Sequence, residues 1–196
     1  ASVADSLIRR LRDTNIEVQR AVVTALGELR AKSAVEPLIQ MLDSDNIELA
    51  KSAAEALGKI KSPTAIRPLV AILSNPSDEL RKVSCEALVS IGKRSLKPLV
   101  AKLEDPDEKV RLAVASGLRL GVPEEERVRV ADGMTARLYD ESSGAVVGEM
   151  LRAIASYGGR EHIQALERFA GDSGTGESHR KATGIAIAQI RRRLGD

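Results

Sequence analysis

The segments TALGEL (24–29), EALGKI (55–60) and EALVSI (86–91) repeat one pattern, in which an aliphatic anchor at the third position follows an alanine. Looser versions occur at SGLRLG (116–121), RAIASY (152–157) and IAIAQI (185–190). The anchors, at intervals of 31, 31, 30, 36 and 33 residues, are Leu26, Leu57, Leu88, Leu118, Ile154 and Ile187. A period of about 20–50 residues is typical of stacked supersecondary units. Such a stack presents a long, regular surface, which suits binding better than catalysis.

The composition agrees with a thin stack of helices. Aromatic residues make up 2% of the 196 residues, and small aliphatic residues supply most of the 43% apolar content. Side chains of this size fill the narrow gap between two helical layers locally, repeat by repeat. The net charge of +2, from 30 basic and 28 acidic residues, leaves no strong electrostatic footprint for DNA or RNA. We therefore expect no nucleic-acid partner.

Each repeat divides into two helices. The first carries apolar residues at helical spacing, and the second begins near an apolar residue seven positions after the last leucine of the first. Three positions before each of these starts lies an accepted N-cap residue. The six caps are Asn15, Asn46, Ser77, Asp107, Ser143 and Gly176. We therefore predict an all-α fold, an α-solenoid (α-α superhelix) of about six helical hairpins.

Prolines are expected to shape the first helix of several hairpins. Ser62 and Pro63 have the order of a cap and a first helical residue. In that case Pro68 lies inside the helix and should kink it. In the fifth unit the pattern predicts a longer first helix that Pro123 opens and Gly133 weakens.

The chain resembles the HEAT repeats, and in particular their short-repeat, phycobilin lyase-like branch. The segments that carry the resemblance are LRDTNIEVQRAVVTALGEL (11–29), LDSDNIELAKSAAEALGKI (42–60) and LEDPDEKVRLAVASGLRLG (103–121). We expect residues 1–121 to form four regular HEAT-like repeats and residues 122–196 two divergent repeats that continue the same solenoid. The resemblance also implies that a loop Asp pairs with an Arg early in the second helix, which only Asp105 and Arg111 fit fully.

Charged residues recur at equivalent positions of the second helices, which line the concave face in HEAT-like proteins. The rows are acidic (Glu17, Glu48, Glu79), basic (Arg20, Lys51, Lys82) and again acidic after a threonine (Thr24, Glu55, Glu86). Lys51 with Glu55 and Lys82 with Glu86 have the spacing of intrahelical pairs. An ordinary charge-mixed solvated face accounts for such rows equally well. The functional interpretation is a docking surface for a partner protein or peptide, formed by Glu17, Arg20, Glu48, Lys51, Glu55, Glu79, Lys82 and Glu86.

Motifs for catalysis, metals or cofactors are not convincing. The stretch GDSGTGES (171–178) has the glycine spacing of a phosphate-binding loop, but Glu177 stands where that loop needs a lysine. His179 is predicted to be partly buried at a helix start, and His162 to be exposed; neither belongs to a recognisable ligand set. Cys85 aligns with small packing residues, so a buried and unreactive thiol is expected. We predict no catalytic residues, no metal site and no cofactor.

Two functions follow from these observations. The first is a non-catalytic interaction scaffold that binds a partner protein or peptide on the concave face. The alternative, which rests on the resemblance, is a phycobilin lyase-type subunit that attaches or detaches a tetrapyrrole on an acceptor protein. No run of residues approaches the roughly 18 apolar residues of a membrane span. A cytoplasmic, monomeric protein with no membrane contact is therefore expected.

Overall fold

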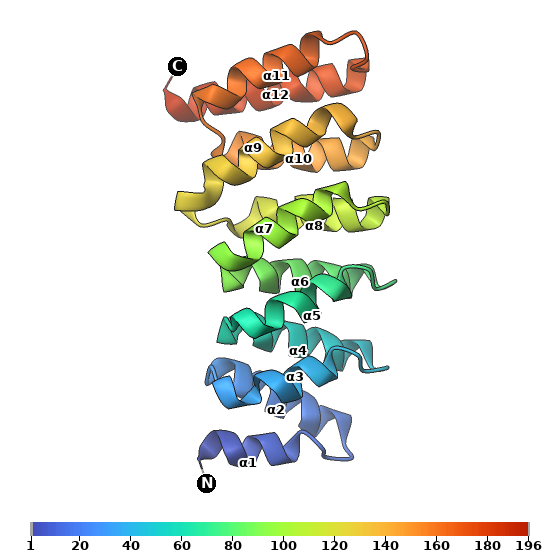
Figure 1. The fold of residues 1–196 in the computed structure, drawn as a ribbon, viewed down its shortest axis with the longest axis vertical. Helices are drawn as coiled ribbons and strands as arrows, with labels where there is room; N and C mark the ends of the chain where they lie inside the picture. Colours follow the sequence, from blue (N-terminus) through green and yellow to red (C-terminus); the bar gives the residue numbers. More distant parts are fainter. Residues whose placement is uncertain (1, 196) are drawn as a thin grey trace. The chain divides into compact units, whose positions relative to one another are not determined.

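The computed structural model describes residues 2–195, and within that range all regular secondary structure is helical (Figure 1). The α-helices are α1 (Val3–Arg10), α2 (Ile16–Glu28), α3 (Val35–Met41), α4 (Ile47–Ile60), α5 (Ile66–Ile72), α6 (Asp78–Ile91), α7 (Lys93–Ala101), α8 (Glu108–Gly121), α9 (Arg127–Arg137), α10 (Gly144–Tyr157), α11 (Arg160–Gly171) and α12 (Glu177–Leu194). Consecutive helices form hairpins, from α1/α2 to α11/α12. The predicted all-α solenoid of about six hairpins is confirmed.

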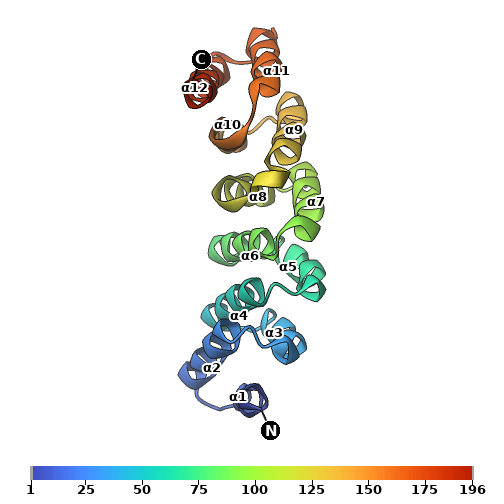
Figure 2. The ribbon, with the colours of Figure 1, turned by 90° about the vertical axis from the view of Figure 1, so that its left-hand side faces the viewer.

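The chain divides into two compact units, with the boundary between Leu99 and Val100. Within the first unit, α2, α4 and α6 form one layer, and α1, α3 and α5 form the other (Figure 2). Within the second unit, α8, α10 and α12 form one layer, and α9 and α11 the other (Figure 2). The second helices of neighbouring hairpins therefore lie side by side in each unit, which brings equivalent residues of successive repeats together.

The six repeat anchors lie in the core between the layers. Leu26, Leu57, Leu88, Leu118 and Ile154 are completely buried, and Ile187 in α12 is 8% exposed. Burying a side chain of this size stabilises the fold by about 1.5–3 kcal/mol. The periodic pattern of the sequence is thus the pattern of the core.

The second helices begin at the residues that the sequence indicated. The N-caps of α2, α4, α6, α8, α10 and α12 are the six predicted residues. In the first five caps the side-chain oxygen accepts a hydrogen bond from a first-turn N–H, as from Leu49 N to Asn46 Oδ1 at 3.0 Å. Each cap satisfies an N–H group that has no partner inside its helix.

Three of the first helices, α3, α5 and α9, follow a short 3₁₀ turn, and this changes the role of one proline. Ser62 is the cap and Pro63 the first residue of a 3₁₀ turn (Pro63–Ala65), and α5 begins at Ile66. Pro68 is consequently the third residue of α5, where a backbone N–H has no intrahelical acceptor in any case. Pro68 therefore lies inside α5, as predicted, but at this place it removes no intrahelical hydrogen bond, and the kink stays a prediction.

The fifth hairpin has the longer first helix that was predicted. Pro123 caps a 3₁₀ turn (Glu124–Glu126), and α9 follows with 11 residues, compared with 7 in α5. Gly133 has a packing role in this helix, because a Cβ atom there would lie 2.8 Å from Val100 Cγ1.

Candidate protein-interaction surface

All eight candidate residues lie on α2, α4 and α6 of the first unit. Glu17 and Arg20 belong to α2, Glu48, Lys51 and Glu55 to α4, and Glu79, Lys82 and Glu86 to α6. These residues separate into two groups that differ in their partners.

Five of them form an ion-pair ladder across the three helices: Glu17, Arg20, Glu48, Lys51 and Glu79. Arg20 lies 3.4 Å from Glu17 and 3.8 Å from Glu48, and Lys51 lies 2.9 Å from Glu48 and 2.6 Å from Glu79. The hydrogen bonds to Glu79 and Glu48 raise the pKa of the Lys51 ammonium, and the same bond lowers the pKa of Glu79. Exposed pairs of this kind stabilise a fold by about 0–1 kcal/mol each. The ladder therefore neutralises most of the charge that the rows carry.

The predicted pairing of Lys51 with Glu55 is wrong, because Lys51 contacts Glu48 one turn earlier and Glu79 on the next helix. Lys82 and Glu86 also make no ion pair with each other within 4.0 Å. Both carboxylates of the third row, Glu55 and Glu86, are left without a charged partner among residues 2–195.

Glu55 and Glu86 line an open groove of about 440 Å³ on the face formed by the C-terminal halves of α2, α4 and α6. Gly27, Gly58 and Ala87 also line this groove. We call it the unit 1 groove. Two of the candidate residues therefore lie at a concavity, whereas the ladder residues lie outside its lining.

The helices α2, α4 and α6 approach one another closely beneath the unit 1 groove. A Cβ atom added to Gly27 would lie 2.9 Å from Ala56 Cα, and one added to Gly58 would lie 2.8 Å from Ala87 Cα. Real Cβ atoms do not come that close to backbone, so only glycine fits at these two positions. Both glycines are buried, so their role is to let α2, α4 and α6 pack closely beneath the groove.

A row of basic residues, which the sequence reasoning missed, lies beside the groove. Arg30 and Lys61 line it, and both have left-handed backbone conformations, with φ of 48° and 57°. Each lies four residues after an anchor, and the third repeat has Gly92 at that place, with φ of 93°. That glycine was the signal available in the sequence, because it marks the helix-ending position where φ is positive.

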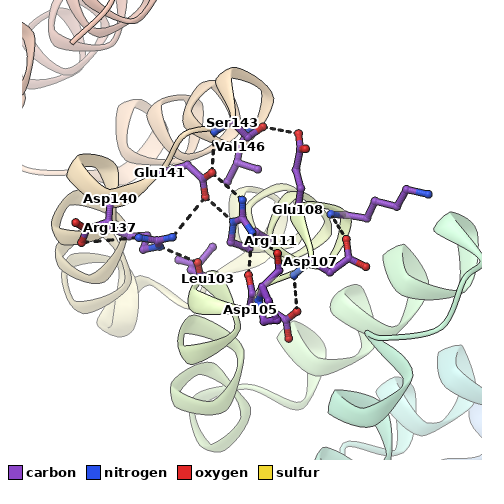
Figure 3. Close-up of polar contacts among 12 residues, drawn as sticks. Leu103, Asp105, Asp107, Glu108, Arg111, Arg137, Asp140, Glu141, Ser143 and Val146 are labelled. Carbon is purple, nitrogen blue, oxygen red and sulfur yellow. Dashed lines mark hydrogen bonds and ion pairs between the residues drawn. The ribbon is translucent and has the colours of Figure 1, made fainter. Parts of the chain in front are cut away.

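A second polar cluster lies in the second unit, between the loop before α8 and the loop before α10 (Figure 3). Arg111 of α8 donates two hydrogen bonds to the Glu141 carboxylate, at 2.7 and 2.9 Å, and one to the carbonyl oxygen of Asp105 at 2.8 Å. Glu141 also accepts from the backbone N–H of Ser143 at 2.8 Å. Because the Glu141 side chain has no exposed surface, these hydrogen bonds offset the free-energy cost of burying its charge.

The resemblance implied an Asp105–Arg111 pair, and the structure corrects its acidic partner. Arg111 bonds to the backbone of Asp105, while the Asp105 carboxylate bonds to Lys102 at 2.7 Å. The buried ion pair instead links Arg111 to Glu141 of the following repeat. Glu141 could have been found from its place two residues before the N-cap Ser143, which matches Asp105 two residues before Asp107.

The pKa values of Glu141 and Arg111 reflect these contacts. Burial by itself raises the pKa of Glu141, but the hydrogen bonds from Arg111 and Ser143 outweigh it and hold that pKa below 4.5. The hydrogen bond to Glu141 raises the pKa of the Arg111 guanidinium. Both groups are therefore charged at neutral pH, and the cluster acts as a structural link between repeats.

His162 is buried, not exposed as predicted. Its side chain is 2% exposed, its Nδ1 accepts a hydrogen bond from Gly159 N at 2.9 Å, and its Nε2 lies 3.2 Å from Asp132 Oδ1. The cause is the packing of α11 against α9, which covers the first turn of α11. Cys85 is fully buried, as predicted, and burial raises the pKa of its thiol to about 12.

Two further observations concern the described residues as a whole. Within residues 2–195, no three His, Cys, Asp or Glu side chains are arranged so that they could hold a metal ion. Across the same range, no helix has both the length and the apolar content that a membrane span requires.

The sequence pattern of HEAT repeats matches residues 4–89 and 66–121 of the chain. The protein belongs to the HEAT repeat family. This confirms the family that the sequence resembles. No protein of curated function matches the chain in sequence.

Solved structures similar to this HEAT repeat protein share its fold at low sequence identity. A TOG domain of crescerin, a protein described as regulating microtubules in the primary cilium, is 16% identical, with 95% of this chain and 89% of that chain covered and a TM-score of 0.57. A designed armadillo repeat protein in complex with the peptide (KR)4 is 22% identical, with 96% and 100% covered and a TM-score of 0.50. The complex of CpcE and CpcF of phycocyanin lyase from Nostoc is 15% identical, with 97% and 95% covered and a TM-score of 0.47.

Proposed function

We propose that this HEAT repeat protein is a non-catalytic interaction scaffold, and that an extended segment of a partner protein binds in the unit 1 groove. The observation that carries the proposal is the groove itself, an open concavity of about 440 Å³ lined by Glu55 and Glu86, two carboxylates that have no charged partner among residues 2–195.

The ion-pair ladder is a less suitable binding site than the groove. Its five charges already have partners at 2.6–3.8 Å, so a ligand that bound them would first have to displace an existing pair. Glu55 and Glu86 can gain a partner without losing one. Lys82, the third candidate outside the ladder, does not line the groove, so Glu55 and Glu86 are the ones we propose as primary contacts.

A similar solved structure agrees with an extended ligand. The designed armadillo repeat protein of the same fold is in complex with the peptide (KR)4. The bilin lyase alternative stays a prediction that rests on the sequence resemblance.

The proposal can be tested by blocking the groove with one large side chain. Ser90 lines the groove and is exposed, so Ser90→Trp fills the space without entering the core. Ala71→Trp is the matched control, because Ala71 is exposed on α5 in the other layer. Peptides are selected from a random library on the full chain, and their Kd values are then measured for the three proteins by fluorescence anisotropy.

We expect selected peptides to lose at least about tenfold in affinity with Ser90→Trp and to keep their affinity with Ala71→Trp. A library that yields no binding peptide, or peptides that bind the blocked and the unblocked protein equally, contradicts the proposed function. Circular dichroism of both variants checks that they remain folded.

A further inference from the structure

The unit 1 groove has charge rows along both of its edges, with opposite sign. Glu55 of α4 and Glu86 of α6 supply the acidic row, and Arg30 and Lys61 at the ends of α2 and α4 supply the basic row. None of the four makes an ion pair within 4.0 Å among residues 2–195. The lining also holds one internal pair, Glu28 with Lys59 at 2.5 Å.

The distance between the two rows follows from helix geometry. Lys61 comes six residues after Glu55, and a helix rises 1.5 Å per residue, so the rows are about 9 Å apart along the helix axis. Gly58 lies halfway between them in the sequence and also lines the groove. The groove therefore runs across the helices, with the floor in the middle and one sign of charge on each side.

An extended peptide has the matching symmetry. Successive side chains of an extended chain point to opposite sides, and residues on one side recur every 6.4–6.8 Å. Neighbouring packed helices are about 8–10 Å apart, a difference that long Lys and Glu side chains can span. A peptide lying along the floor would thus direct alternate side chains towards the acidic row and the others towards the basic row.

The backbone at the basic row adds an independent observation. Arg30 and Lys61 adopt φ of 48° and 57°, where glycine is favoured and where the third repeat does have a glycine. A left-handed conformation costs an ordinary residue about 1–2 kcal/mol. In both residues it is the conformation that ends the helix, and it places the two side chains at equivalent positions of the groove edge.

We propose that the ligand of the unit 1 groove is an extended peptide segment in which acidic and basic residues alternate. Its basic side chains contact Glu55 and Glu86, and its acidic side chains contact Arg30 and Lys61. This inference rests on the proposed function and specifies its ligand. An all-basic peptide such as (KR)4 meets only one row and is repelled by the other.

Synthetic peptides distinguish an alternating order of charges from charge composition alone. The probe is the acetylated and amidated octapeptide (Glu-Lys)4, and its matched control is (Glu-Glu-Lys-Lys)2, which has the same composition but places both signs on each edge. The peptide (Lys-Arg)4 is the all-basic comparison. Each is titrated against the full chain by isothermal calorimetry at low salt, where exposed charges are least screened.

Each exposed ion pair strengthens binding by about 1.4- to 5-fold, so four pairs predict that (Glu-Lys)4 binds at least about fourfold tighter than (Glu-Glu-Lys-Lys)2. The double variant Glu55→Lys/Glu86→Lys should remove this preference. Glu36→Lys, at an exposed position of α3, should leave it unchanged.

Equal affinities for the two isomeric octapeptides, or tighter binding of (Lys-Arg)4, would overturn the alternating-charge ligand. If peptides selected from the library still lose affinity with Ser90→Trp in that case, the proposed function stands and only the ligand pattern fails. If no peptide binds in either experiment, both fail.

Discussion

Replacing Glu141 with glutamine should destabilise the protein far more than the same replacement at Glu149. Both glutamates pair with an arginine of α8: Arg111–Glu141 at 2.7 Å and Arg119–Glu149 at 3.0 Å. The Glu141 side chain is fully buried and that of Arg111 is 11% exposed, whereas Arg119 is 37% exposed. The two pairs thus have the same chemistry and an arginine on the same helix, and they differ in burial.

The expected magnitudes follow from that difference. Glu141→Gln leaves a buried guanidinium without its counter-charge, and removing one partner of a buried pair costs about 3–5 kcal/mol. Glu149→Gln weakens two partly solvated pairs, with Arg119 and with Arg152 at 2.5 Å, each of which contributes no more than about 1 kcal/mol. The free energy of unfolding is measured by urea titration followed by circular dichroism at 222 nm, with the slopes compared to check that the same transition is observed.

Equal losses for the two variants would refute the reasoning, since burial would then not decide what the pair contributes. A loss below about 1 kcal/mol for Glu141→Gln would also refute the structural role of the cluster. The positions of both glutamates in the second unit make the comparison independent of the peptide-binding proposal.

Four further predictions concern particular residues. Gly58→Ala should lower the free energy of unfolding by about 1–2 kcal/mol, because its Cβ would overlap the Ala87 backbone. Gly184→Ala, with open space around the new Cβ, should raise that free energy by up to about 1 kcal/mol in the same urea titration. Lys61→Gly should raise the unfolding free energy by about 1 kcal/mol, because it relieves a positive φ, and a melting curve checks this. The Cys85 thiol, with a pKa of about 12, should react with Ellman's reagent at pH 8 only as fast as the protein opens, and rapid reaction of the native protein would contradict its burial. The pKa of Glu141 is lowered from 4.5, so its contribution to stability should be complete above about pH 4.5 and be lost as the pH falls through the folded pKa. The unfolding free energy of the Glu141→Gln variant should therefore depend less on pH in that acidic range.

The sequence allowed the helical framework to be predicted because periodicity and capping are local signals. An anchor such as Leu57 must be buried in every repeat, and a cap such as Asn46 must satisfy the N–H groups of its own helix. Neither depends on how neighbouring repeats are packed. The six second-helix caps were therefore located to the residue.

The pairing of charges could not be predicted in the same way. Lys51 reaches Glu79 because α4 and α6 lie close together, and intrahelical spacing alone favours Glu55 instead. Glu141 was missed, although it keeps the place of Asp105 relative to the N-cap, because Arg111 was paired with the loop of its own repeat and instead reaches the loop of the next one. His162 was misplaced because its burial depends on α9, an element distant in sequence.

The role of the two groove glycines could be predicted only in part. Gly27 and Gly58 recur one residue after their anchors, which is visible in the sequence, but their close approach to Ala56 and Ala87 depends on helix packing. Only with that packing known do the glycines explain why α2, α4 and α6 lie so close together beneath the groove.

The most direct test of the central claim is the mapping of amide chemical shifts while the full, isotope-labelled protein is titrated with (Glu-Lys)4. The account predicts that the largest shift changes occur at the floor and basic edge of the unit 1 groove, at Gly27, Arg30, Gly58 and Lys61. Changes centred on the ion-pair ladder or on the second unit, with the amides of Gly27 and Gly58 unmoved, would contradict it.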